Sequence, residues 1–120
     1  IHGREPLLIN PNDAKIRNLK NDDIVKVFND RGSCLAGIKI SDDVMEGIVF
    51  LPVGAWYNPA VDDDTFCVHG NPNVLTDDIG CSSLSQGPSA HSTLVEIHKW
   101  EKDLPSITIF NAPVLKKLKL

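Results

Sequence analysis

The chain has 120 residues, 42% of them hydrophobic and 23% charged, which is the balance of one globular domain that can bury its own core. Its formal charge of −4 excludes the dense Lys and Arg array of a nucleic-acid-binding protein. The three cysteines have no C-x-x-C spacing, which argues against a zinc site or disulfide framework, and no apolar run reaches the ~20 residues of a membrane span.

The first forty residues predict a strand, a short helix and a hairpin. Leu7–Ile9 is a short apolar strand, and Asn10 followed by Pro11 is a typical helix start, with the helix ending near residues 20–21. The alternating, β-branched stretches 23–29 and 33–40 predict two strands. Between them Asp30-Arg31-Gly32 predicts a turn, in which Gly32 is free to adopt positive φ.

The remainder contains fewer regular elements. Ile48–Leu51 is a continuous apolar run, which predicts a strand buried on both faces. Residues 52–72 and 73–92 are interpreted mainly as loops, and 93–100 as a further alternating strand. The sum, five to seven short strands with one or two short helices, predicts a mostly β domain, more a barrel than an open sheet.

Signatures of familiar catalytic sites are missing. There is no G-x-G-x-x-G, no P-loop and no G-x-S-x-G, and the four histidines lie far apart. The acidic run Asp62–Asp64 has the wrong continuation for an EF-hand and predicts a solvated loop. A pairing of His91 with the nearby serines is a chance arrangement more than a triad. The sequence therefore predicts no catalytic residue and no metal ligand.

Two polar loops carry the chemistry that is present. Gly54–Pro59 offers two flat aromatic rings, and Gly70–Gly87 gathers amides, hydroxyls, carboxylates and glycines into eighteen positions. Amides and carboxylates match the edges of a guanine or pterin, while hydroxyls and backbone N–H groups beside glycine can approach phosphates. The alternative is an ordinary long loop built from turn residues, and composition alone does not separate the two interpretations.

Five motifs in order resemble a known family. They are G-R-E-P-x-x-I-N-P-x-D-A from Gly3, K-N-D-D-I-V-K-V-F-N-D-R-G from Lys20, G-A-W-Y from Gly54, N-V-L-T-D-D-I-G from Asn73 and S-x-L-S-Q-G from Ser82. Together they resemble the C-terminal domain of the dimethyl sulfoxide, trimethylamine N-oxide and biotin sulfoxide reductases, with the match running to about residue 100. The sequence departs from many relatives at Gly80-Cys81-Ser82, where they carry Gly-Thr-Ser.

The resemblance implies a double-psi β-barrel (aspartate decarboxylase-like) that binds molybdopterin guanine dinucleotide. It divides the chain into a cofactor-binding domain, 1–102, and a C-terminal extension, 103–120. Residues that match the family's cofactor loops are, first, Asn73 and Gln86, and then Thr76, Asp78, Ser82, Ser83, Trp56 and Tyr57. Arg4 and Glu5 match the start of the domain and are interpreted as structural. The molybdenum ligand lies in upstream domains of the same polypeptide, which are the expected partners.

Within that family the domain binds and orients the cofactor, so the isolated chain is expected to be inactive. The branch resemblance favours the periplasm over the cytoplasm. Two alternatives stay open: a stand-alone cofactor-binding subunit of a molybdenum or tungsten enzyme, and a double-psi-barrel protein-recognition module without cofactor. An exposed apolar groove in place of a polar cleft lined by Asn73, Asp78 and Gln86 would favour the second.

Overall fold

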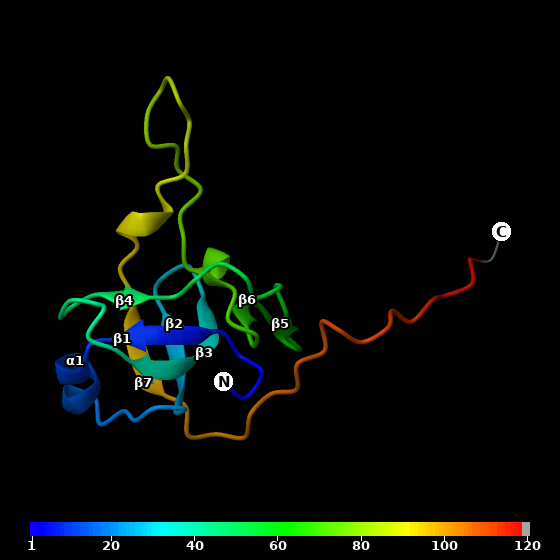
Figure 1. Ribbon diagram of the computed structural model, residues 1–120. Helices are drawn as coiled ribbons and strands as arrows, with labels where there is room; N and C mark the ends of the chain where they lie inside the picture. The colour runs from blue at the N-terminus through cyan, green and yellow to red at the C-terminus, as the bar shows by residue number, and fades with distance from the viewer. Residues whose placement is uncertain (119–120) are drawn as a thin grey trace.

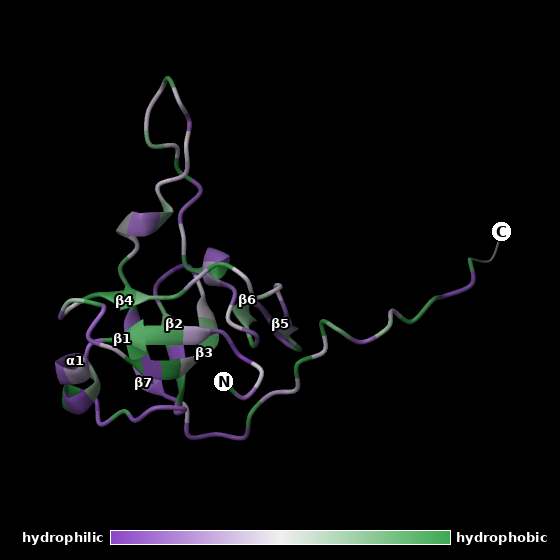
Figure 2. Cartoon of the chain, viewed as in Figure 1, coloured by the Kyte–Doolittle hydropathy of each residue, from purple (hydrophilic) through white to green (hydrophobic). Residues whose placement is uncertain are grey.

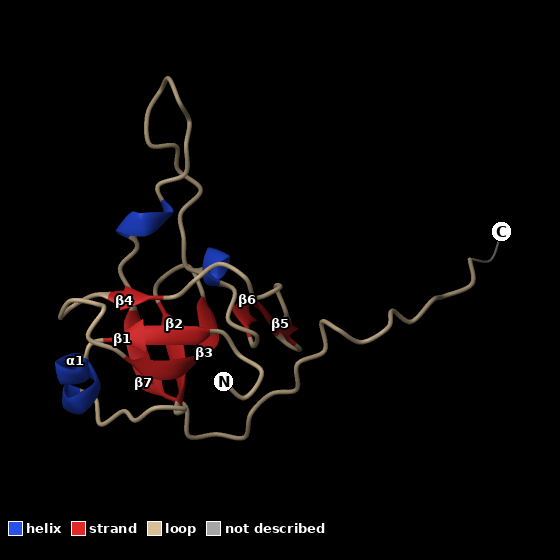
Figure 3. Ribbon diagram, in the orientation of Figure 1, coloured by secondary structure: helices blue, strands red, loops and turns tan. Residues whose placement is uncertain are grey.

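The computed structural model describes residues 1–118, with a curled sheet at the centre, one long loop leaving it and an extended C-terminal segment (Figures 1 and 3). Its elements are β1 (Pro6–Ile9), α1 (Pro11–Ile16), β2 (Ile24–Phe28), β3 (Ser33–Ile40), β4 (Val49–Phe50), β5 (Pro59–Ala60), β6 (Asp63–Cys67), the 3-10 helices η1 (Pro72–Val74) and η2 (Ala90–Ser92), and β7 (Glu96–Lys99). The prediction of a mostly β domain with short helices is confirmed. No helix among the described residues is long and apolar enough to cross a membrane.

Strand β3 is the central strand of the seven-stranded sheet. The sheet order is β4-β1-β3-β2-β7, and β6 also pairs with β3 and carries β5. The pairs β1–β3 and β3–β6 are parallel, whereas β2–β3 is the predicted antiparallel hairpin, with Val27 opposite Cys34. Strand β3 therefore pairs with β1, β2 and β6, and the sheet is curled as in a small β-barrel.

The core fills the inside of this curled sheet. Its largest completely buried side chains come mostly from β1, β2 and β3, with Cys67 at the end of β6 and Val68 after it. Hydrophobic residues of the central sheet are green in Figure 2. Six consecutive residues of β3, 33–38, are buried, because the strand is covered on both faces rather than on alternate positions. Burial of this kind, at ~25 cal/mol per Å² of apolar surface, is the main stabilising contribution to the barrel.

Several predicted boundaries are wrong. The helix ends at Ile16 because Arg17 leaves helical geometry and Asn18 has a φ of +52°, although Leu19 is still buried. The apolar run 48–51 forms a two-residue edge strand, with Phe50 53% exposed, rather than a strand buried on both faces. The segment 52–72, predicted as mainly loop, also contributes β5, β6 and the start of η1, and the rest of it is loop as predicted.

Candidate functional site

A hollow whose lining residues are mostly of polar types, here called the polar hollow, lies where the β2–β3 turn, strand β6 and helix η1 meet. Its volume is about 430 Å³. It is lined by Arg31, Tyr57, Asp64, Thr65, Asn71, Asn73 and Val74. Two of the predicted cofactor residues, Tyr57 and Asn73, are thus brought together from loops sixteen positions apart.

Gly32 allows the hairpin turn to approach the other two segments. A Cβ on Gly32 would lie 2.5 Å from the carbonyl oxygen of Val74 and 2.7 Å from that of Thr65. The turn at Gly32 is where the sequence predicted it, but Gly32 does not have the positive φ that was expected there. The glycine is needed because of the close approach. The close approach, which excludes any side chain, is what positions Arg31 at the hollow.

Arg31 is held in place by the loop that it faces. Its Nε donates to the carbonyl of Leu75 at 2.8 Å, and its Nη1 lies 3.2 Å from the carboxylate of Asp77. Asn29 supports the same turn, donating to Leu75 and accepting from the backbone of Arg31. The guanidinium is therefore a fixed positive group at the wall of the hollow.

Helix η1 presents Asn73 to the hollow. The side chain of Asn71 caps it, accepting from the backbone N–H of Asn73 at 2.9 Å, and Pro72 follows at the first helical position. The buried sulfur of Cys67 accepts from the backbone N–H groups of Asn71, at 3.5 Å, and of Asn58, at 3.4 Å. One thiol at the end of β6 thus connects the segments that carry Asn73 and Tyr57.

Tyr57 contributes a phenol, whose O–H donates to the backbone carbonyl of Asp64. Desolvation, with a smaller contribution from the nearby Asp64 carboxylate, raises the pKa of the Tyr57 phenol. The group accordingly remains a protonated hydrogen-bond donor at neutral pH.

Trp56 faces a different surface from Tyr57. It does not line the hollow: its indole is 64% exposed and packs against Phe110 of the C-terminal segment, with ring centroids 5.7 Å apart. Its carbonyl lies 2.8 Å from Nδ1 of the buried His69. The predicted aromatic pair is therefore split between two surroundings.

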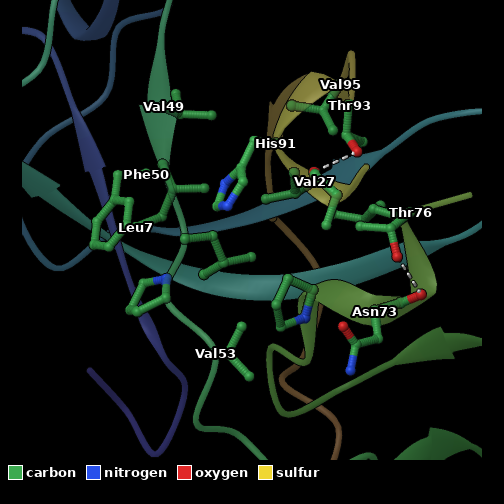
Figure 4. Close-up of a pocket in the computed structure, with 15 residues that line it drawn as sticks. Leu7, Val27, Val49, Phe50, Val53, Asn73, Thr76, His91, Thr93 and Val95 are labelled. Atoms are coloured by element: carbon green, nitrogen blue, oxygen red, sulfur yellow. Dashed lines mark hydrogen bonds between the residues drawn. The ribbon is translucent and has the colours of Figure 1, made fainter. Parts of the chain in front are cut away.

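An apolar cavity of about 300 Å³ adjoins the hollow (Figure 4). Aliphatic side chains of β1, β2 and the segment after β4 form most of its wall, and His91 points into it between Val49 and Val27 (Figure 4). Asn73 and Thr76 line its edge, where the Thr76 hydroxyl donates to the carbonyl of Asn73 at 3.3 Å. Asn73 is common to the walls of both cavities.

The remaining predicted residues lie on a projecting loop, residues 78–89, that leaves the barrel (Figure 1). It is closed by the bridge Gly80–Pro88 and by a 2.7 Å bond from the N–H of Cys81 to the carbonyl of Gly87. Gln86 has a φ of +53° and donates back to the carbonyl of Ser83. The hydrogen bond with Ser85 is the largest contribution lowering the pKa of the exposed Cys81 thiol.

The structure thus brings the predicted site residues together only in part. Tyr57, Asn73 and Thr76 meet at the two cavities. The loop residues Asp78, Ser82, Ser83 and Gln86 line neither of the two cavities described above.

Sequence reasoning did not predict the other five residues that line the hollow, which are Arg31, Asp64, Thr65, Asn71 and Val74. The Asn71-Pro72 pair carries a capping signal that could have marked η1 as an ordered platform. Nothing local to the turn indicates that Arg31 faces it.

Other chemistry is scarce in the described part of the chain. Residues 1–118 contain no group of three or more His, Cys, Asp or Glu side chains that could hold a metal ion. Arg4, interpreted as structural, is buried and donates from Nε to the carbonyl of Val68 at 3.0 Å, which agrees with that role.

Several known proteins are similar to this chain in sequence. The chain is 50% identical over 116 residues to the trimethylamine-N-oxide reductase of Salmonella typhimurium, covering 95% of this chain and 14% of that protein. It is 48% identical over 110 residues to trimethylamine-N-oxide reductase 1 of Escherichia coli (strain K12), and 43% over 115 residues to the Vibrio cholerae reductase. These two alignments cover 90% and 95% of this chain, and 13% and 14% of the relatives. The chain therefore spans about one seventh of the curated relatives that it matches.

A family model describes most of the domain. The model of the molydopterin dinucleotide binding domain matches residues 1–94, which include every strand up to β6, both 3-10 helices and all eight predicted site residues. The 120-residue chain belongs to the molydopterin dinucleotide binding domain family.

Proposed function

We propose that this domain binds molybdopterin guanine dinucleotide at the polar hollow and the adjoining projecting loop. The observation that carries the proposal is the meeting of Arg31, Tyr57 and Asn73 at one hollow, in a chain whose family is defined by dinucleotide binding. No pair of these residues is close in sequence, so the fold itself assembles them.

The donor set fits such a cofactor. The fixed Arg31 guanidinium suits the negative charge of a phosphate, and its pairing with Asp77 keeps it in one orientation. The Asn73 amide can donate and accept at the edge of a guanine or pterin, and the Tyr57 phenol oxygen, whose proton goes to the Asp64 carbonyl, can accept. When bound, the cofactor supplies electron transfer at molybdenum, while these residues bind and orient it.

The projecting loop is assigned the second part of the site. Asp78, Ser82, Ser83 and Gln86 are satisfied mainly within the loop or point into solvent, and no barrel element holds them. In the proposal, the loop takes its position by contacting the bound dinucleotide and the neighbouring domains of the polypeptide.

We further propose that the complete polypeptide reduces an S- or N-oxide, as the names of the trimethylamine-N-oxide reductases suggest. This chain contributes cofactor binding, with residues 1–102 as the domain proper, and upstream domains supply the molybdenum ligand. The isolated chain is then inactive. The similarity to this reductase branch supports a periplasmic location, which cell fractionation of the complete polypeptide would check.

The protein-recognition alternative has one observation in its favour. The cavity shown in Figure 4 is mainly apolar, and Asp78 and Gln86 do not line it. The stand-alone subunit is less well supported, since the matching relatives contain this region as about one seventh of a longer chain.

A titration followed by residue-resolved amide shifts tests the proposal. Guanosine diphosphate is added to the 120-residue chain, and the cofactor content of the complete polypeptide is then measured. Shifts at Tyr57, Arg31 and Asn73, even at millimolar affinity (~4 kcal/mol), support the site. Asn73→Ala should abolish these shifts and lower cofactor content, whereas the matched Asn12→Ala, on α1, should change neither. Unchanged cofactor content in the Asn73→Ala polypeptide would contradict the assignment.

A further inference from the structure

The segment 103–111, here called the strap, is fastened across the barrel after the last strand. It runs beside the N-terminal residues and the β5–β6 region (Figure 1). Alignments with the reductases cover 95% of the chain, and only 18 residues follow position 102, so these alignments reach into the strap. The strap is therefore shared, at least in part, with those relatives.

Asn58 is the central fastening. Its side chain is 3% exposed, and its Oδ1 accepts from the backbone N–H groups of Thr108, at 2.7 Å, and Ile109, at 2.9 Å. Its Nδ2 lies 3.2 Å from the Thr108 hydroxyl oxygen, to which it donates. Nδ2 also donates to the carbonyl of Pro59, at 3.4 Å, but both bonds accepted by Oδ1 come from the strap. Detachment of the strap would leave this buried oxygen unsatisfied, which makes detachment unfavourable.

Arg4 provides a second fastening close to the start of the chain. The guanidinium, itself buried, donates to the carbonyls of His2, Val68 and Pro105. Ile107 packs over Gly3, where a Cβ would lie 2.8 Å from its Cδ1. The strap is thus bound to the barrel by two buried polar side chains and one apolar contact.

The fastened strap then contacts the loop that carries Trp56. Phe110 packs on the Trp56 indole on one side and meets the His69 ring edge-on at 5.3 Å on the other. His69 in turn contacts the carbonyl of Trp56 at 2.8 Å. Both the ring and the backbone of Trp56 are therefore positioned, directly or through His69, by a residue of the strap.

We propose that Asn58 is a positioning residue which, by fastening the strap, places Phe110 against Trp56 and so fixes the Gly54–Tyr57 loop at the edge of the cofactor site. The value of this loop for cofactor binding rests on the function proposed above. The restraint of the loop by the strap is independent of that proposed function.

Backbone hydrogen exchange of the complete polypeptide, measured by mass spectrometry without added cofactor, tests the restraint. Asn58→Ala and Phe110→Ala should each raise exchange of residues 54–57 about tenfold, the factor corresponding to about 1.4 kcal/mol. Asn58→Asp, which keeps the acceptor oxygen, should restore slow exchange. Val114→Ala is the matched control, because Val114 is 90% exposed on the same tail. Exchange in β2 should be unchanged in all four variants.

Phe110→Ala keeps the test decisive if Asn58→Ala fails to fold, since Phe110 is an exposed side chain whose removal leaves the core intact. Slow exchange at residues 54–57 in Phe110→Ala would overturn the proposal. The rate at which the loaded polypeptide loses its cofactor is then compared. Faster cofactor loss in Phe110→Ala, together with faster exchange, supports both the restraint of the loop by the strap and the contribution of the loop to cofactor binding. Faster exchange with unchanged loss supports the restraint and removes Trp56 from the cofactor site.

Discussion

The barrel side of the candidate site and the projecting loop are built in opposite ways. On the barrel, Arg31 is held by bonds to Leu75 and Asp77 from a distant part of the chain. The 3-10 helix that carries Asn73 is capped by Asn71 and lies directly against Gly32 of the β2–β3 turn. In the projecting loop the hydrogen bonds join residues no more than ten positions apart. The comparison teaches that one half of the site is preorganised by the fold, whereas the other has a local shape whose placement depends on what it contacts.

The largest expected difference between the two regions is in stability. Leu35 is completely buried in β3 and Leu84 is 96% exposed at the loop, so the same substitution samples both environments. Leu35→Ala should lower the free energy of unfolding by about 2–5 kcal/mol through lost burial and a cavity. Leu84→Ala should change it by no more than ~0.5 kcal/mol. Chemical denaturation measures both, and equal losses would show that the loop packs on the barrel.

A smaller loss of stability is expected when the cap of η1, the 3-10 helix that carries Asn73, is removed. Asn71→Ala removes the side chain that accepts from the Asn73 N–H and should cost about 1 kcal/mol of stability. It should also weaken guanosine diphosphate binding, because the platform under Asn73 loosens. Asn71→Ser retains a capping oxygen and serves as the control. Equal binding by both variants would mean that the cap has no part in presenting Asn73.

The smallest effect is confined to the loop and leaves stability unchanged. Cys81 is exposed and the pKa of its thiol is lowered, first by the Ser85 hydrogen bond, whereas burial raises the pKa of Cys34 to about 12. A lowered pKa means more thiolate at neutral pH, so maleimide should label Cys81 alone and faster than an ordinary exposed thiol. Ser85→Ala should move the pH midpoint of labelling upward. Mass spectrometry of the labelled protein would detect a second modified cysteine, which would contradict native burial of Cys34 and Cys67.

Local patterns were sufficient for the central strands. The β2–β3 hairpin follows from two alternating stretches and a turn, and β1 from a single apolar run. Local sequence patterns did not predict the extent of strands whose length is set by the strands that they pair with. The run 48–51 pairs with β1 at only two positions. Strand β6 forms because it can pair with β3, and β5 because it can pair with β6, which no local periodicity shows.

The candidate site divides in the same way. Asn73 and Tyr57 were predicted from motifs, and the structure places both at the hollow, although their contact with cofactor stays a prediction. Arg31 was out of reach, because its location depends on the approach of Gly32 to Val74, forty-two positions away. The sequence also gave no reason to separate Trp56 from Tyr57, since the strap that draws Trp56 away lies more than forty residues downstream.

The contact between Arg4 and Pro105 has a consequence for the connectivity of the domain. These residues are 101 positions apart, yet the guanidinium touches the carbonyl, so the barrel segment of the chain forms a nearly closed ring. A short linker joining the two ends, with new termini opened near Leu84, would preserve every strand pairing. Circular permutation at the projecting loop is therefore compatible with this architecture, and the permuted chain would carry its termini at the surface where neighbouring domains and cofactor are proposed to meet.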